Sequence, residues 1–281
     1  MHNKLAFGAI IVSTIAIVLT LSATKDSTES LADNVISTGV IRIGYVVYPP
    51  TLIKDPNTGA LSGIAYDIAE QAAKNLGLET EWVEEVGWGS MIEGLRSGRY
   101  DMIGTLIWPN SARAREAAFS TPVMYSAVYP YARSGDTHFE SDPARLNSDT
   151  VTLATLDGEM TTFIAQNDFP LAKTYALPQL SSVSELLLGV TSGKADVTFA
   201  EPAIANDFLK NNPGSIYRVG DTPIRIFGNV FAVARGEHEF LAMWNVALQE
   251  LAFDGTIKRT IQKYAAEESY LPTAYPVGNN W

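Results

Sequence analysis

The side chains that usually carry nucleophilic or metal chemistry are scarce in this sequence. It contains no cysteine, which excludes thiol catalysis, thiolate zinc sites, disulfides and lipid attachment through cysteine. Its three histidines, His2, His138 and His238, lie far apart along the chain. A histidine metal site or a Ser-His-Asp triad therefore has no evident basis. These absences weigh against an enzyme, and we expect no cofactor and no metal.

The overall charge also restricts the partners. The 281 residues include 20 Lys and Arg against 31 Asp and Glu, for a net charge of -11, and the basic residues form no long run. A nucleic-acid surface needs a concentrated basic patch, so we expect no nucleic-acid partner. The acidity mainly confers solubility and does not by itself indicate a cationic ligand.

The N-terminus predicts export. Residues 5–24 form a run of 20 residues without a charge after Lys4. Such a run is typical of a signal peptide, but it is also long enough to span a bilayer as an uncleaved anchor. A buried core helix is a third interpretation. Residues 1–24 are thus a signal or a hydrophobic anchoring helix, residues 25–36 a polar tether, and the remainder lies outside the cytoplasm, soluble or tethered to the inner membrane.

After the tether, strand-like and helix-like segments alternate. Ile64, Ile68, Ala72 and Leu76 recur every four residues, which predicts a helix with one buried stripe. Strands alternating with helices indicate an α/β fold with a parallel sheet. Further strands are expected at 41–47, 79–83, 100–107, 151–156, 196–200 and 226–233, and further helices from 91 and 161 and at 183–190, 202–210, 239–253 and 257–265.

Two successive α/β units predict two lobes with a cleft between them, where small ligands usually bind. Tyr129–Ser134 and Ile226–Ala232 are the candidate connecting strands. The first lobe would then comprise residues 37–131 and 228–281, and the second lobe residues 132–227.

Six motifs in order resemble the bacterial extracellular solute-binding proteins of family 3, known as amino-acid receptors of ABC transporters. They begin at Tyr48-Pro49-Pro50 and cover about residues 36–268. The other five are GALSGIAYDIAEQAAKNLG, VGWGSMIEGLRSGRYDMI, NSARAREAAFSTPV, GKADVTFAEPA and LQELAFDGTIKRTIQKY. The resemblance implies a two-lobed, type II periplasmic-binding-protein-like fold with two crossover strands.

The resemblance also implies a role for two charged residues. Arg113, six residues before Phe119-Ser120, matches the arginine that holds the α-carboxylate of the ligand, and a guanidinium suits this task because its planar fork pairs both oxygens. Glu201 occupies the position of the aspartate that binds the α-ammonium group. The alternatives are a surface arginine at a helix start and an acid that favours a helix N-terminus beside Pro202.

The resemblance places six other residues in the ligand site. Trp88 and Tyr48 match aromatic positions that sandwich the ligand, although large aromatics are more often core residues. Asn110 could donate to a carboxylate, and Thr161 could bind the ligand from the second lobe. Trp108 departs from the family pattern and would narrow the pocket or fill the place of the ligand. Glu159 also departs from it, and we slightly prefer to interpret it as a solvated loop acid.

The resulting prediction is a monomer that closes around an amino-acid-like zwitterion or cation and delivers it to the membrane subunits of an ABC transporter. The alternatives are an exported dehydratase acting on prephenate or arogenate, with Glu159 or Glu201 as proton donor, and a membrane-tethered ligand sensor.

Overall fold

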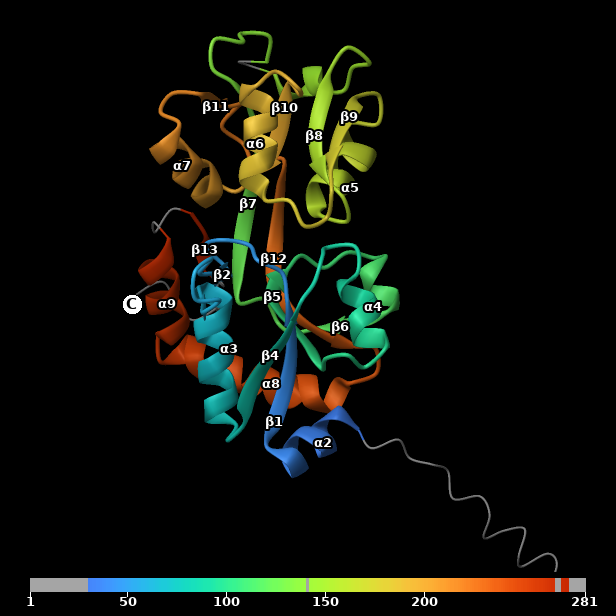
Figure 1. Cartoon of the computed structure of the whole chain (residues 1–281), viewed down its shortest axis with the longest axis vertical. Coiled ribbons are helices and arrows are strands. Elements are labelled where there is room, and N and C mark those ends of the chain that lie inside the picture. The colour runs from blue at the N-terminus through green and yellow to red at the C-terminus, as the bar shows by residue number, and fades with distance from the viewer. Residues whose placement is uncertain (1–29, 140–141, 266–268, 273–281) are drawn as a thin grey trace, which may run out of the picture.

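The computed structural model describes residues 30–139, 142–265 and 269–272. Within them, most strands form a mixed sheet in the order β4-β1-β5-β12-β7-β10-β8-β9, with β6, β11 and β13 pairing beside this path. Strands β2 and β3 form a separate two-stranded sheet. Figure 1 shows two bodies, one above the other, joined by β7 and β12. We call the lower body lobe 1 and the upper body lobe 2.

Lobe 1 is built on three parallel strands, with β1 (Val40–Tyr45) between β4 (Glu79–Glu85) and β5 (Met102–Ile107). Helices α3 (Ile64–Asn75) and α8 (His238–Phe253) pack on this sheet and on each other, because each has one apolar face. The other elements of lobe 1 are β2 (Ile53–Lys54), β3 (Leu61–Ser62), α4 (Met91–Arg96), the 3-10 turn η1 (Arg113–Arg115), β6 (Ala117–Phe119) and α9 (Thr256–Tyr264).

Lobe 2 repeats the arrangement on a smaller scale. Its central strand β8 (Thr152–Leu156) runs parallel to β9 (Lys173–Leu177) and to β10 (Val197–Ala200). The other elements are η2 (Pro143–Leu146), α5 (Met160–Asp168), α6 (Val183–Thr191), α7 (Pro202–Asn211) and β11 (Ile216–Arg218). The carboxyl ends of β8 and β10 lead directly into α5 and α7, so the residues between strand and helix lie at one edge of the sheet.

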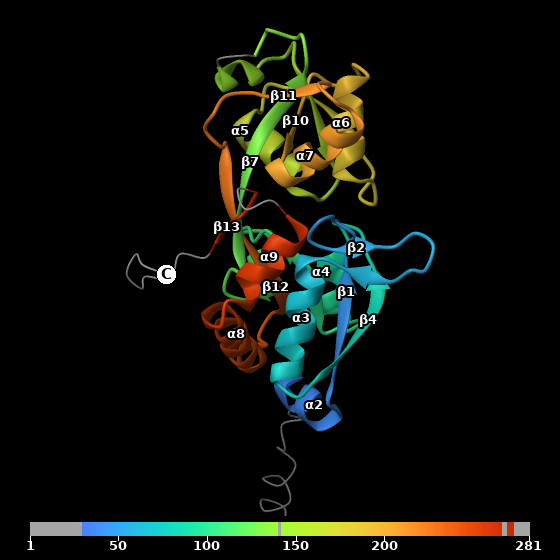
Figure 2. The same cartoon turned by 90° about the vertical axis from the view of Figure 1, so that its left-hand side faces the viewer.

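Two long strands connect the lobes. The first half of β7 (Met124–Arg133) pairs with β12 (Arg225–Ala234), and its second half pairs with β10 and β11 of lobe 2. The second half of β12 pairs with β5 and β6 of lobe 1. The turned view in Figure 2 shows both strands running between the bodies. The expected lobe boundaries at 131/132 and 227/228 fall inside these strands.

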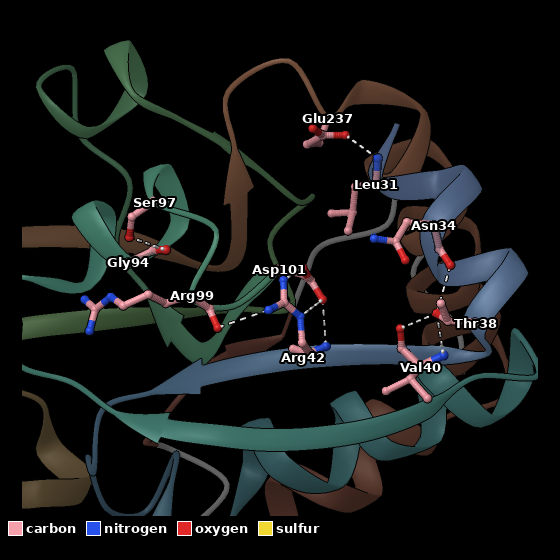
Figure 3. A network of polar contacts seen from close by, with 10 residues as sticks. All are labelled: Leu31, Asn34, Thr38, Val40, Arg42, Gly94, Ser97, Arg99, Asp101 and Glu237. Carbon is pink, nitrogen blue, oxygen red and sulfur yellow. Dashed lines mark hydrogen bonds and ion pairs between the residues drawn. The ribbon is translucent and has the colours of Figure 1, made fainter. Parts of the chain in front are cut away.

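The expected tether is wrong from residue 31 onward, because this part folds as helix α2 (Leu31–Thr38). The hydroxyl of Ser30 accepts a hydrogen bond from the backbone N–H of Asp33 (3.1 Å), which caps the first turn. Val35 is buried against the core of lobe 1. The carboxylate of Glu237 accepts a hydrogen bond from the backbone N–H of Leu31 (2.9 Å), as Figure 3 shows. The segment is polar because only one face of this short helix is covered.

The expected hydrophobic helix of residues 5–24 lies outside the described residues. Among the helices that the structure describes, none is both long enough and apolar enough to cross a bilayer.

Candidate functional site

Arg113 lies buried at the boundary between the lobes. It begins η1, a single 3-10 turn, and is 8% exposed, so it is not a surface arginine at a helix start. Its guanidinium donates to the carbonyl of Trp108 (2.7 Å) and, across the lobe boundary, to the carbonyl of Gly158 (2.9 Å). The ring of Phe163 lies 5.9 Å from the guanidinium carbon. A guanidinium has five N–H groups, so these two bonds leave donors for a carboxylate.

Burial changes the electrostatics of this arginine. It lowers the pKa of Arg113 to about 10, and the nearby negative charge of Glu159 opposes that shift. The side chain is therefore still a cation at neutral pH. Among the described residues, no carboxylate forms an ion pair with it. The site thus contains a desolvated cation without a direct ion-pair partner, and the charge of Glu159 acts on it only from beyond ion-pair distance.

Glu201 faces the same boundary from lobe 2. It follows β10 and precedes Pro202, the first residue of α7, but its side chain does not cap that helix. It is 1% exposed, and its Oε2 accepts a hydrogen bond from the hydroxyl of Tyr48 of lobe 1 (2.8 Å). Its Oε1 is buried without a hydrogen-bond partner in the part of the chain that the structure describes. Burial raises the pKa of Glu201 to about 7, and hydrogen-bonding contacts with Ser126 and Tyr48 oppose the rise.

Glu159 is buried, so our preference for a solvated loop acid is wrong. It is 3% exposed and caps α5, where its Oε2 accepts hydrogen bonds from the backbone N–H and the hydroxyl of Thr161 (both 2.7 Å). Burial raises the pKa of Glu159, and these bonds partly offset the shift. The sequence hides this burial, because a glutamate is a less usual N-cap than Ser, Thr, Asp or Asn.

Thr161 is occupied by its own neighbours. Besides donating to Glu159, its hydroxyl accepts a hydrogen bond from the backbone N–H of Leu156 (2.9 Å). This network orients the Glu159 carboxylate at the start of α5. A direct contact between Thr161 and a ligand would use only the remaining lone pair of the hydroxyl.

The three aromatic candidates are buried and make different contacts. Tyr48 and Trp88 meet edge to face, with ring centroids 5.3 Å apart and planes at 87°, so in this state they touch each other rather than hold a side chain between parallel faces. Trp108 stacks on Phe227 of β12 (4.6 Å) and donates from its indole N–H to Asn229 (2.9 Å). The stacking and this hydrogen bond hold the Trp108 ring against β12.

Asn110 contacts Arg113 through its amide oxygen, and its amide N–H groups are donors without a partner among the described atoms. Its Oδ1 accepts a hydrogen bond from the backbone N–H of Arg113 (2.9 Å). Its Nδ2 is buried and has no partner among the described atoms. A buried amide donor without a partner costs free energy, so this group is suited to a ligand oxygen.

Two cavities lie beside these residues at the lobe boundary. One, of about 380 Å³, is lined by Tyr48, Pro49 and Pro50 of lobe 1 and by Ala203 and Ile204, which follow Glu201 in lobe 2. The other, of about 390 Å³, lies between Asn110 of lobe 1 and Phe163 and Phe227. Both have walls from both sides of the boundary, as expected of a cleft between lobes.

A second set of contacts across the boundary was not expected from the sequence. The backbone N–H of Gly89 donates to the side-chain oxygen of Gln179 (2.9 Å), which lies between β9 and α6. At Gly158, an added Cβ would lie 2.6 Å from the backbone nitrogen of Gly89. Gly89 and Gly158 permit this close approach because neither has a side chain. No local pattern in the sequence predicts the role of Gln179, since its contact with Gly89 exists only when the lobes meet.

The described residues hold no group of three or more His, Cys, Asp or Glu side chains that could bind a metal. The cluster of Arg113, Glu159, Glu201 and Tyr48 combines one cation with two acids in a desolvated space. Such a set can bind a small molecule that carries charges of both signs.

Comparison with known proteins assigns the chain to a protein family. A model of the bacterial extracellular solute-binding proteins, family 3, matches residues 41–267. The chain belongs to this family. The resemblance in the motifs is thereby confirmed, and the two-lobed α/β fold is the fold of solute-binding proteins.

Two curated relatives and one solved structure illustrate the similarity of this family 3 protein. A probable amino-acid ABC transporter-binding protein of Haemophilus influenzae is 27% identical over 238 residues, which cover 82% of this chain and 86% of that protein. An L-cystine-binding protein of Escherichia coli K12 is 25% identical over 90% of this chain and 92% of its own length. An ancestral amino acid-binding protein, described as a precursor of cyclohexadienyl dehydratase, has a TM-score of 0.74 at 25% identity and covers 84% of this chain and 100% of its own.

Proposed function

We propose that this family 3 protein captures a free amino acid between its lobes, outside the cytoplasmic membrane, and delivers it to the membrane subunits of an ABC transporter. Arg113 and Asn110 bind the α-carboxylate, and Glu201 binds the α-ammonium group. Glu159, held by Thr161, adds a negative charge beside Arg113. Tyr48, Trp88 and Trp108 form the apolar walls.

One observation carries the proposal. Arg113 and Glu201 are both almost fully buried, yet neither has an oppositely charged partner within ion-pair distance in the described chain. A buried charge without a partner is costly, and a zwitterion would neutralise both groups at once. The names of the relatives, which include amino-acid and L-cystine receptors, support the same ligand class.

Binding and closure are coupled in this proposal. Arg113 and Asn110 lie in lobe 1, whereas Glu201 lies in lobe 2, so only the closed arrangement presents both sets of contacts to one ligand. The ligand therefore selects the closed state. The run of residues 5–24 delivers the chain across the membrane as a signal, or holds it there as an anchor, and the binding unit acts as a monomer. Mass spectrometry of the mature N-terminus distinguishes the two forms.

A thermal-shift screen tests the function. The purified protein is heated with each of the twenty L-amino acids, with L-cystine, with polyamines and with small organic acids. A ligand present at one hundred times its Kd adds about 2.7 kcal/mol of stability, or roughly 5–10 °C in a protein of this size. A shift only with ligands that lack an amino group or a carboxylate would contradict the proposal.

The dehydratase alternative keeps one observation in its favour. The pKa of Glu201, raised to about 7 by burial, would allow this carboxyl to donate a proton near neutral pH. The ancestral binding protein described as a dehydratase precursor shares the fold. Incubation with prephenate and arogenate, followed by detection of phenylpyruvate and phenylalanine, tests this alternative, and Glu201→Gln should abolish any product formed.

A further inference from the structure

The C-terminal segment returns to the lobe boundary after the last helix. Strand β13 (Leu271–Pro272) pairs antiparallel with β7 at Tyr125 and Met124. Figures 1 and 2 both place it beside the connecting strands, between the two bodies. The family model matches residues 41–267, so this segment lies outside the matched residues.

Tyr270 enters the interior from this segment. It is 2% exposed, and its ring belongs to the apolar core of lobe 1. Its hydroxyl makes no well-formed hydrogen bond with any atom that the structure describes, and Thr51 is the side chain that approaches it as a hydrogen-bonding group. A phenol that is buried normally finds a partner for its hydroxyl, so this group lacks an interaction that the site can supply.

The residue before Tyr270 lines the same cavities as the neighbours of Glu201, since Ser269 lies with Ala203 around one cavity and with Pro202 around another. Burial raises the pKa of Tyr270 well above its usual value, and the negative charge of Glu201 raises it further, while Thr51 opposes the shift. The hydroxyl of Tyr48 donates to Glu201. Burial raises the pKa of Tyr48, and Glu201 and Tyr270 raise it further. Because Ser269 lines both cavities, the segment lies beside the residues that adjoin the carboxylate proposed to receive the ligand.

Two buried polar atoms in this part of the described chain lack a well-formed hydrogen bond, the Oε1 of Glu201 and the hydroxyl of Tyr270, although Ser126 and Thr51 approach these two side chains. We propose that Tyr270 is a ligand-binding residue whose hydroxyl accepts a hydrogen bond from the same ammonium group that Glu201 binds. An ammonium group has three N–H donors, so it can satisfy both oxygens at once. This inference rests on the amino-acid-binding function proposed above, and it restricts the ligand to compounds with a free primary amino group.

Removing only the hydroxyl tests the inference. Isothermal titration calorimetry measures the Kd of the wild type and of Tyr270→Phe for every L-amino acid that the screen identifies, and for its N-acetyl derivative. Loss of a hydrogen bond to a charged group should weaken binding of the free amino acid by about tenfold or more. The N-acetyl derivative should bind neither protein. The melting temperature of empty Tyr270→Phe should not fall, because the phenylalanine leaves no unpaired hydroxyl.

Tyr100→Phe is the matched control. Tyr100 is equally buried, but its hydroxyl donates to the carbonyl of Met91 (2.5 Å) within lobe 1. This variant should lose stability and keep the Kd of the wild type. A double-mutant cycle with Glu201→Gln adds a readout that a purely structural role would not change, since two groups that bind one ammonium should have non-additive effects on affinity.

The outcomes separate the two proposals. An unchanged Kd in Tyr270→Phe, or effects of Tyr270→Phe and Glu201→Gln that simply add, overturns the role of Tyr270 and leaves the amino-acid-binding function intact. A wild type that binds no amino acid overturns both.

Discussion

At the scale of single residues, the site is defined by polar groups that the protein leaves unpaired. Among the described atoms, the Arg113 guanidinium donates only to main-chain carbonyls, the Asn110 amide keeps a donor without a partner, and Glu201 keeps an oxygen without a well-formed hydrogen bond. Most buried polar groups in proteins are satisfied, so a cluster of exceptions indicates where another molecule binds. The positions also show its polarity, with donors on the lobe 1 side and acceptors on the lobe 2 side.

Replacing Arg113 should remove ligand binding. In Arg113→Ala the carboxylate of the ligand would be buried without a partner, which costs about 2–5 kcal/mol, or roughly 30-fold to several thousandfold in Kd. Arg113→Lys should recover only part of the loss, since an ammonium cannot form the planar fork. The Kd is measured by calorimetry, and the melting temperature of the empty protein should change little.

Arg115→Ala is the control for this prediction, because Arg115 lies in the same turn with an exposed side chain. Equal affinity of the wild type and Arg113→Ala would show that the guanidinium does not hold the carboxylate.

Closure of the empty protein should depend on pH through Glu201. In the open state the carboxyl faces water and titrates near its usual pKa, whereas burial in the closed state raises the pKa to about 7. A group whose pKa rises on closure favours the closed state below the lower pKa, and this contribution is lost as the pH rises through about 7. A pKa shift of this size corresponds to about 3 kcal/mol in the free energy of closure.

Small-angle X-ray scattering at pH 5 and pH 8 measures this effect as a change in the radius of gyration. The empty wild type should be more open at pH 8. Glu201→Gln, which cannot ionise, should respond much less, and an equal response of both proteins would exclude Glu201 as the cause.

At the scale of elements, the closed state depends on how closely two loops approach. The loop at Gly87–Gly89 of lobe 1 meets the turn between β8 and α5 and the side chain of Gln179 in lobe 2. Gly158 is essential to this contact because its φ of 75° favours glycine and because Gly89 leaves no room for a side chain.

Gly158→Ala should therefore impair ligand binding through closure. The added methyl group would clash with the backbone of Gly89, so the lobes could not meet and the Kd should rise at least tenfold. Gly214→Ala is a matched control, since Gly214 has a similar φ of 67° in lobe 2 but no atom near an added Cβ. Both variants should lose about 1 kcal/mol of stability from backbone strain. If both also kept the affinity of the wild type, the close contact would not limit closure.

At the scale of the whole molecule, the pairing of β7 with β12 is the connection between the two lobes in the described part of the sheet. The short strand β13 pairs with β7 beside this connection. A narrow connection of this kind permits the lobes to rotate against each other while each core stays intact. Under the proposed binding mode, binding energy can then be used for closure, because the ligand would touch both sides of the boundary.

Ligand-induced closure should be visible by energy transfer between two dyes. The natural chain has no cysteine, so cysteines introduced at the exposed positions Arg96 of lobe 1 and Leu188 of lobe 2 can be labelled cleanly. Addition of the amino acid should bring the dyes closer and raise the transfer efficiency. Arg113→Ala should show no change at the same concentration, and a wild-type signal independent of ligand would argue against hinge closure.

Much of the fold was predictable from local patterns. The four-residue spacing of Ile64, Ile68 and Ala72 correctly predicts α3, and the alternation of strands and helices correctly predicts the two α/β units. Edge strand β9 (Lys173–Leu177) was missed because its side chains are mostly exposed and it is defined by pairing with β8. Helix α2 was missed because its polar composition resembles a linker, and its burial depends on contacts with α8 more than 200 residues away.

By itself, the sequence determined the family, the order of the elements and the positions of Arg113 and Glu201, because periodicity and motif spacing are local properties of the chain. Only the tertiary structure decided that Glu159 is buried, that Tyr48 bonds to Glu201 and that the segment at β13 returns to pair with β7. Tyr48 and Glu201 are 153 residues apart. Burial and hydrogen-bond partners at such separations depend on how the two lobes meet, and no local pattern contains that information.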